Sequence, residues 1–314
     1  MPSEIVIRPM EPDDVDEADR VMRVAFGTYF GATEPETFFG DAEIVRTRFA
    51  IDPECAFVAE NDRLVVGSIF VARWGSFSFL GPLTVRPDLW SRGIAKRLME
   101  PVVDLFDRWQ VRHSGLFTFA ESVKHVGLYQ RFGYWPQYLT AIMSKPVGAA
   151  PVECDYALFS DLPESQKSAT LAACRDITDA IYDGLDLTQM ITSVEQHRLG
   201  DTVLLYQHGE PAAFAVCHCG AGEAGSQNCH IKFGAVRPNA TSRQLFEELL
   251  QACEALPHAR GIERIEASIN IGRHEAYRTM LDAGFRVSFN GVRMHRPNDV
   301  GFCRPNDFVI DDLT

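Results

Sequence analysis

Residues 85–98 read VRPDLWSRGIAKRL, which combines the end of an apolar strand, a short turn and the start of an amphipathic helix. The turn contains Gly93 and the small residue Ala95. The first turn of a helix leaves backbone N–H groups unpaired, and with the helix dipole these groups attract anions. Arg92, Lys96 and Arg97 add positive charge. The stretch therefore predicts a phosphate-binding turn, although a turn that binds no ligand could contain the same residues.

The sequence on either side of this turn is repeated later in the chain. The tripeptide Val-Arg-Pro ends a strand-like stretch at residues 85–87 and again at 236–238, which is 151 residues later. A Gly-aromatic pair ends a helical stretch at residues 133–134 and, at the same offset, at 284–285. The segments EIVIRPMEPDD and DYALFSDLPES align in the same way. Three matches at one offset indicate a tandem duplication. The repeat predicts domains at residues 1–147 and 154–300 and a C-terminal tail at 301–314.

Each half is predicted to be an α/β domain with a mixed sheet, because strand-like and helix-like periodicities alternate along it. In the first half, a helix is expected from near Pro12 and another from Arg92 to Gln110, with Pro101 kinking it or removing a hydrogen bond. A third helix, VKHVGLYQRF, should end at Gly133. The expected strands are residues 4–10, 56–60, 64–74, 77–85, 116–120 and 140–147.

Composition and charge narrow the class of protein. The chain of 314 residues is 46% hydrophobic and 23% charged, which suits a globular protein with two cores. It has no run of 18 apolar residues and no apolar signal-peptide core, so we expect a cytoplasmic protein that does not enter a membrane. Its net charge of −13 argues against nucleic acid as a partner and favours a cationic substrate. A monomer and a homodimer are both compatible with the sequence.

The eight cysteines do not predict a disulfide framework or a metal site. In the stretch AFAVCHC, residues 213–219, Cys217 and Cys219 flank His218. Such alternation places both cysteines on one face of a strand, where small core residues lie. Zinc sites typically use wider cysteine spacing and four converging ligands.

The order of elements around residues 85–98 resembles the GNAT family of acyl-CoA-dependent N-acyltransferases. Val-x-Pro is followed by Gly93-Ile94-Ala95, an amphipathic helix, a strand and the segment LYQRFGY, residues 128–134. The family's loop, R/Q-x-x-G-x-G/A, corresponds to residues 90–95, with Trp90 in place of the usual first residue. This departure removes a side-chain contact but leaves the backbone amides. The resemblance covers the first half and, through the duplication, the fold of the second, and it implies acetyl-CoA as the acyl donor.

The resemblance also implies a role for each matching residue. The strand end would pair with the pantetheine arm, and the loop amides would hold the pyrophosphate. Tyr129 would protonate the departing thiolate, or else be a core aromatic residue of an amphipathic helix. Ser122 stands where many members have an Asn that contacts the cofactor arm. The predicted cofactor-binding residues are Leu83, Thr84, Val85, Ser91, Arg92, Gly93, Ile94, Ala95, Lys96 and Ser122.

The reaction also needs a base, because an ammonium group has no lone pair with which to attack. Family members often use a Glu or a chain of waters. Glu121 directly follows the strand at residues 116–120, at the end facing the expected cleft. Its alternative role is that of a solvated carboxylate at a helix start. Glu60 and Glu43 are weaker candidates.

The second half has lost the matching residues. At the offset of 151, the two small residues of the turn and the tyrosine correspond to Gln244, Phe246 and Met280. The first two side chains would fill the space that a phosphate needs, and Met280 has no proton to donate. Tyr277 could substitute for the tyrosine, but packing is the simpler role. We therefore expect a degenerate domain that packs against the first and shapes the acceptor pocket.

The sequence thus predicts an N-acetyltransferase that transfers an acetyl group from acetyl-CoA directly to a primary amine of a small molecule. The alternatives are a non-catalytic acyl-CoA sensor or scaffold, and an enzyme that acetylates protein or peptide N-termini. Residues 26–43 are expected to form the acceptor pocket, although a helix–loop–helix core would need the same side chains. Their aromatic residues are Phe26, Tyr29, Phe30, Phe38 and Phe39, and their acidic residues are Glu34, Glu36, Asp41 and Glu43.

Overall fold

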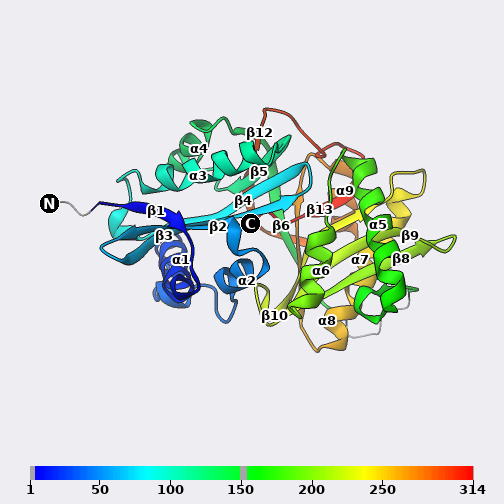
Figure 1. Cartoon of the computed structure of the whole chain (residues 1–314). Coiled ribbons are helices and arrows are strands. Elements are labelled where there is room, and N and C mark those ends of the chain that lie inside the picture. Colours follow the sequence, from blue (N-terminus) through cyan, green and yellow to red (C-terminus); the bar gives the residue numbers. More distant parts are fainter. Residues whose placement is uncertain (1–3, 149–153, 314) are drawn as a thin grey trace.

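The computed structural model describes residues 4–148 and 154–313, whose strands join into one mixed sheet. The strand order is β1-β2-β3-β4-β5-β12-β6-β11-β10-β9-β8-β7, and β13 also pairs with β10 (Figure 1). The strands are β1 Val6–Pro9, β2 Ala56–Asn61, β3 Leu64–Trp74, β4 Phe77–Val85, β5 His113–Thr118, β6 Trp135–Pro146, β7 Ala157–Leu158, β8 Gly200–Gln207, β9 Glu210–Gly220, β10 Gly225–Val236, β11 Arg264–Asn270, β12 Arg286–Arg296 and β13 Val309–Asp311.

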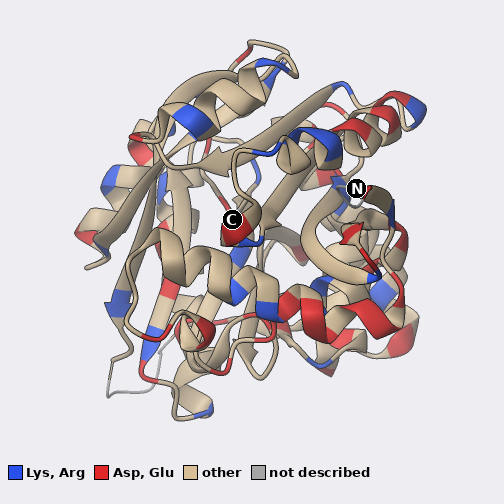
Figure 2. Ribbon diagram, turned by 90° about the vertical axis from the view of Figure 1, so that its left-hand side faces the viewer, with Lys and Arg blue, Asp and Glu red and all other residues tan. Residues whose placement is uncertain are grey.

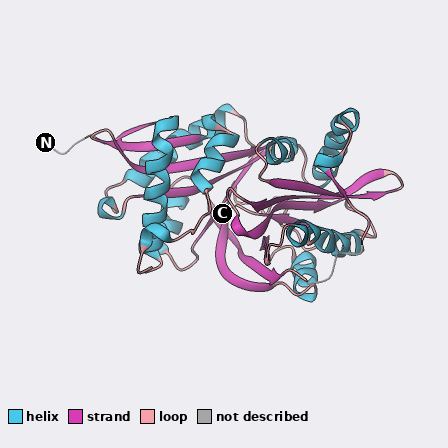
Figure 3. Cartoon of the chain, turned by 90° about the horizontal axis from the view of Figure 1, so that it is seen from below, coloured by secondary structure: helices cyan, strands magenta, loops and turns pink. Residues whose placement is uncertain are grey.

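Helices cover both faces of the sheet, as the second half shows in Figure 3. In the first half, β3 is buried without interruption from Val65 to Val71, because apolar side chains pack on both of its faces. The α-helices are α1 Val15–Tyr29, α2 Ile44–Ile51, α3 Ile94–Arg108, α4 Val123–Gln130, α5 Glu164–Ile181, α6 Thr188–Gln196, α7 Ser242–Cys253, α8 Ala255–Ala259 and α9 His274–Asp282. The short 3-10 helices are η1 Pro12–Asp14, η2 Pro35–Thr37, η3 Pro53–Cys55, η4 Pro87–Leu89 and η5 Phe159–Asp161.

The duplication is visible in where the elements begin. β5, α4 and β6 begin at residues 113, 123 and 135, and β11, α9 and β12 begin at residues 264, 274 and 286, each 151 residues later. α3 corresponds to α7 and α8 together. α3 continues through Pro101 to Arg108, so the proline does not end the helix. The tandem α/β architecture predicted from the sequence is therefore confirmed.

The two halves exchange a strand, which the sequence did not indicate. β12 lies between β5 and β6 of the first half, with Val292 opposite Thr118 and Leu139. β6 in turn pairs with β11 of the second half, where Met143 lies opposite Ala267. The predicted limits, 1–147 and 154–300, therefore describe the repeat in the sequence, while each half completes its sheet with a strand from the other.

One apolar core is shared by both halves. Trp74 and Phe79 of the first half pack with Phe233 of the second, with ring centroids 5.4 Å apart for Trp74 and Phe233. Leu313 belongs to the same core, so the segment that follows β13 lies between the halves. On the face drawn in Figure 2, acidic and basic residues are interspersed rather than gathered into a continuous basic surface. None of the helices in the described ranges has an apolar stretch long enough to cross a membrane.

The two cysteines of the CHC stretch lie where the strand periodicity places them. Cys217 and Cys219 are buried in the core of the second half, on β9, together with Cys229 and Cys253. Their role in the structure is packing.

Candidate active site

The predicted phosphate-binding turn has an open backbone. Gly93 is the N-cap of α3 with φ +79°, and a Cβ added there would have no atom within 4 Å. Ser91, two residues earlier, also has a positive φ of +66°. Lys124 reaches the turn from α4, and its Nζ donates a hydrogen bond to Ser91 Oγ at 3.1 Å. The turn thus presents a helix start, free space and a cation in one place, which fits an anionic ligand.

Trp90 has a structural role at the position where the sequence departs from the family pattern. Its Nε1 donates to the carbonyl oxygen of Val85 at 2.6 Å. Lys124 Nζ lies 5.7 Å from the centre of its ring, within the range of a cation–π contact. The indole therefore ties the turn to the end of β4.

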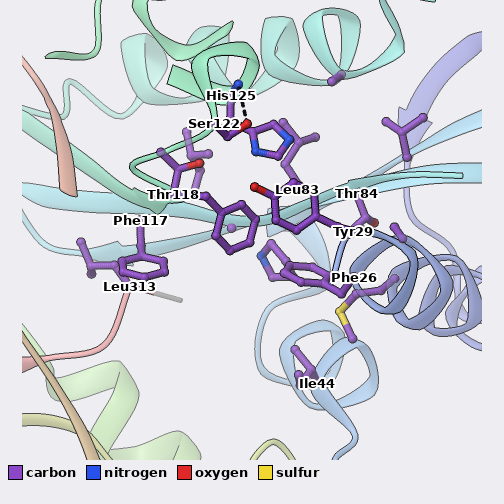
Figure 4. Close-up of a pocket in the computed structure, with 18 of the residues that line it drawn as sticks. Phe26, Tyr29, Ile44, Leu83, Thr84, Phe117, Thr118, Ser122, His125 and Leu313 are labelled. Atoms are coloured by element: carbon purple, nitrogen blue, oxygen red, sulfur yellow. Dashed lines mark hydrogen bonds between the residues drawn. The ribbon is translucent and has the colours of Figure 1, made fainter. Parts of the chain in front are cut away.

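β4 and β5 diverge and leave a slot beside the turn. They pair in parallel only from Phe77–His113 to Phe79–Gly115. Farther along, Leu83, Thr84 and Val85 keep their partners on β3 but pair with no strand of the described chain on the other side. That edge is a row of main-chain hydrogen-bonding groups open to an extended ligand. Figure 4 shows Leu83 and Thr84 across from Phe117 and Thr118 of β5.

A single cavity of about 1030 Å³ connects the turn, the slot and the second half of the chain. Arg92 alone of the ten predicted cofactor-binding residues is not part of its lining. The nine that line it are Leu83, Thr84, Val85, Ser91, Gly93, Ile94, Ala95, Lys96 and Ser122. Ser122 is also the N-cap of α4, where its Oγ accepts a hydrogen bond from the His125 amide.

The Tyr129 side chain reaches this cavity from α4 and is only 8% exposed. Burial raises the pKa of the phenol, so it keeps its proton at neutral pH. The hydroxyl makes no hydrogen bond to another residue of the described chain. It is therefore available to a bound ligand.

His125 lines the cavity one helical turn before Tyr129. Burial lowers the pKa of its imidazole, which is therefore neutral at pH 7. Nδ1 is buried and has no partner within the described chain. The sequence analysis missed this residue, although the spacing i, i+4 from Tyr129 was a usable signal.

The predicted base, Glu121, lies outside the cavity lining and is exposed. Its Oε1 accepts a hydrogen bond from the Tyr29 hydroxyl at 3.3 Å. The two weaker candidates are also outside the cavity lining. Glu60 pairs with Arg8 at 2.7 Å, and Glu43 lies 3.8 Å from Arg46.

The segment expected to form the acceptor pocket contributes its aromatic residues but not its acidic ones. All five aromatic side chains line the cavity, and Phe30 contacts Phe119 and Phe289 with ring centroids 5.3 and 5.9 Å apart. The four acids are absent from the lining. Asp41, for example, accepts a hydrogen bond from the amide of Ser226 at 3.2 Å instead. The pocket wall is thus aromatic and spans both halves.

The second half supplies a polar floor to the same cavity, defined here as five alternating residues of two strands. Alternate residues share one face of a strand, and here that face turns toward the cavity while Cys229, Ile231 and Ala267 lie in the core. His230 and Glu266 are neighbours across the two strands, with Nε2 and Oε1 3.4 Å apart. The floor residues are Asn228, His230 and Lys232 of β10 and Glu266 and Ser268 of β11.

Lys232 of the floor belongs to a network of buried charges that also lines the cavity. Lys232 Nζ donates to Glu223 Oε1 at 3.1 Å and also to Asp312. Arg48 of α2 donates to Glu223 through Nε at 3.1 Å and to the carbonyl oxygen of Gly81 through Nη1. Burial would raise the pKa of Glu223, but Arg48 and Lys232 outweigh it and hold the pKa below its usual range. The charges are therefore kept, and they connect the floor to β4.

The equivalent cleft of the second half is filled by the chain itself. β13 pairs along β10 at residues 233–235, and Gly234 and Ala235 stand 151 residues after Leu83 and Thr84. Phe246, which replaces the small residue of the turn, is fully buried and packs against Phe308 with ring centroids 5.5 Å apart. Met280 is also fully buried, and Tyr277 packs against the same core.

Known proteins agree with this architecture. Residues 21–134 match the model of the acetyltransferase (GNAT) family. A GCN5-related N-acetyltransferase from Sphaerobacter thermophilus superimposes with a TM-score of 0.62 at 18% identity, covering 99% of this chain and 98% of that one. A tandem GNAT protein from the clavulanic acid biosynthesis pathway gives 0.59 at 13% identity, covering 93% and 98%. No curated protein matches the chain by sequence. The chain therefore has the tandem GNAT fold, with the sequence pattern of that acetyltransferase family in its first half.

Proposed function

We propose that this tandem GNAT chain is an N-acetyltransferase that transfers an acetyl group from acetyl-CoA to the primary amine of a small molecule. One observation carries the proposal. A single cavity joins the phosphate-binding turn, the slot beside β4 and the Tyr129 hydroxyl in the first half to the polar floor of the second. A donor and an acceptor can therefore meet in one place.

Residues of the first half would hold the donor. The amides of residues 91–96, with Lys96 and Lys124, suit the pyrophosphate, because free space and positive charge coincide there. The open edge of β4 at Leu83–Val85 suits the amide groups of the pantetheine arm. Bound there, the thioester supplies an activated acetyl group.

The remaining chemistry is proton movement. The neutral amine nitrogen bonds to the thioester carbonyl carbon as the carbon–sulfur bond breaks, so the amine loses a proton and the sulfur gains one. Tyr129 donates to the sulfur, since its phenol is buried, protonated and without another partner. His125 accepts the amine proton, because it is neutral and faces the cavity. Glu121 remains the alternative base, acting through the Tyr29 hydroxyl.

The shape of the cavity favours a small acceptor. The floor of the second half closes one side of the cavity, which suits a small molecule better than a polypeptide. The wall offers aromatic surface, and the floor adds the carboxylate of Glu266, which lies 3.4 Å from His230 across the strands. An amine with an apolar body suits such a pocket. A protein N-terminus as acceptor is the second candidate, and a sensor without activity is the third.

Calorimetric titration with acetyl-CoA tests the proposal on the natural chain and on Gly93→Glu. We expect one binding event per chain and an affinity loss of roughly tenfold or more in the variant, because a carboxylate would face the phosphates. Gly261→Glu is the matched control, since Gly261 also has a positive φ, +67°, and open space around its Cβ position. A chain that binds no acetyl-CoA, or a control that loses as much affinity, would refute the assigned site.

Binding alone would also suit a sensor, so turnover is measured next. A panel of primary amines is incubated with acetyl-CoA, and the free thiol released is followed. Amine-dependent release supports the enzyme, and its absence across small amines and N-terminal peptides would favour the sensor.

A further inference from the structure

We propose that Leu313, delivered by the C-terminal strand, sets the length of acyl group that the site accepts, and restricts it to short chains. The inference rests on the proposed function, because it concerns the acyl donor. It assigns a use to the degenerate second half, whose former cofactor cleft holds the strand that carries Leu313.

The C-terminal segment is fixed firmly in that cleft. β13 occupies the edge of β10 that corresponds to the pantetheine-pairing edge of β4. Asp311 is completely buried between Arg273 and Arg293, with contacts of 2.5 Å to each. The amide of Asp312 donates to the carbonyl oxygen of Lys232 at 2.9 Å. The position of the next residue, Leu313, is therefore determined by the second half.

Leu313 lies at the point where β4 and β5 diverge. The side chain is 1% exposed and belongs both to the shared core and to the cavity lining. A Cβ added to Gly115, in the last β4–β5 pair, would lie 3.1 Å from Leu313 Cδ1. Figure 4 shows Leu313 beside Phe117 at the inner end of the slot.

The order of the binding elements points the acyl group toward this end. Phosphates belong at residues 91–96 and the arm along β4 from Val85 to Leu83, so the group beyond the sulfur heads toward Gly81 and Leu313. A longer chain would first meet the Leu313 side chain. The ion-paired side chains of Arg48, Glu223 and Lys232 line the same cavity. Added methylene groups would gain little binding free energy there, because an apolar chain beside buried charges displaces the polar contacts of those charges.

The test measures affinity for acetyl-, butyryl- and hexanoyl-CoA by calorimetry, which needs no knowledge of the acceptor. In the natural chain, affinity should fall from acetyl- to hexanoyl-CoA. In Leu313→Ala the space opened should accept the longer chains, at a gain of about fourfold per methylene newly buried. Butyryl-CoA has two methylenes more than acetyl-CoA, so the ratio of butyryl- to acetyl-CoA affinity should rise about 16-fold.

Leu256→Ala is the matched control, since Leu256 is a buried leucine of α8 that does not line the cavity. Its acyl preference should equal that of the natural chain. Leu313→Phe should sharpen the preference for acetyl-CoA. If all chains bind acetyl-CoA but the acyl preference is the same in each, the role of Leu313 is refuted while the proposed function stands. If none binds acetyl-CoA, the proposed function fails first.

Discussion

Tyr129 and His125 lie four residues apart on α4, so both side chains face the cavity from one side of the helix. Burial acts on them in opposite directions, because it disfavours the charged form of each. It raises the pKa of the phenol and lowers that of the imidazole. The result at neutral pH is a protonated acid next to an unprotonated base. Acetyl transfer from a thioester to an amine needs one group of each kind.

Comparing His125→Gln with Glu121→Gln identifies the base. We expect the first variant to lower kcat about 100-fold and the second to change it little, because general-base catalysis typically contributes 10²–10⁴. Because burial lowers the pKa of His125 below 6.5, the activity of the natural chain should be constant above neutral pH. It should fall only in more acidic solution, as the pH approaches this lowered pKa. The measurement is kcat against pH for all three chains. The opposite order of the variants would assign the step to Glu121.

At the scale of elements, the repeat could be predicted from the sequence but the pairing of strands could not. Matching letters at residues 85–87 and 236–238 revealed the duplication, and glycine with small residues marked the turn at Gly93. A strand's periodicity shows which face is buried, but it does not name the neighbouring strand. The exchange of β6 and β12 was therefore hidden.

The polar floor was hidden for a related reason. Lys232 and Glu223 are buried charges whose partners, Arg48 and Asp312, lie far away in the sequence. Read alone, a lysine in a strand suggests an exposed edge. Only the fold brings the compensating charges together. The polar floor that they help to form could therefore not be predicted from the sequence.

The strand β13 depends on one carboxylate, and Asp311→Asn tests this. The substitution leaves two buried arginines facing a neutral amide, so the free energy of unfolding should fall by about 3–5 kcal/mol. Urea denaturation measures it. The control is Asp183→Asn, whose partner Arg112 is exposed, and its effect should be much smaller. Equal stability of Asp311→Asn and the natural chain would show that β13 is held by its main-chain pairing alone.

At the scale of the whole molecule, the interface between the halves contains uncharged histidines. His113 of β5 and His295 of the exchanged strand β12 meet where these two strands pair, with ring centroids 4.6 Å apart. Burial lowers the pKa of His113 to about 4 and that of His295 well below its usual value. In the second half, burial lowers the pKa of His218 to about 3. The fold therefore accepts these residues only in their neutral form.

The lowered pKa values of these histidines predict that the folded chain loses stability in mild acid. Below pH 6.5 the unfolded chain protonates these histidines while the folded chain does not, so protons favour unfolding. The free energy of unfolding should be constant above pH 7 and decline from 6.5 toward 4, with a slope approaching about 1.4 kcal/mol per pH unit for each histidine. Urea denaturation at pH 7.5, 6.5, 5.5 and 4.5 measures the decline. His113→Phe should reduce the slope, because Phe can pack beside Phe77 and does not titrate. If stability stays constant down to pH 4.5, the histidines gain a proton in the folded chain, and the buried, neutral state assigned to them here is refuted.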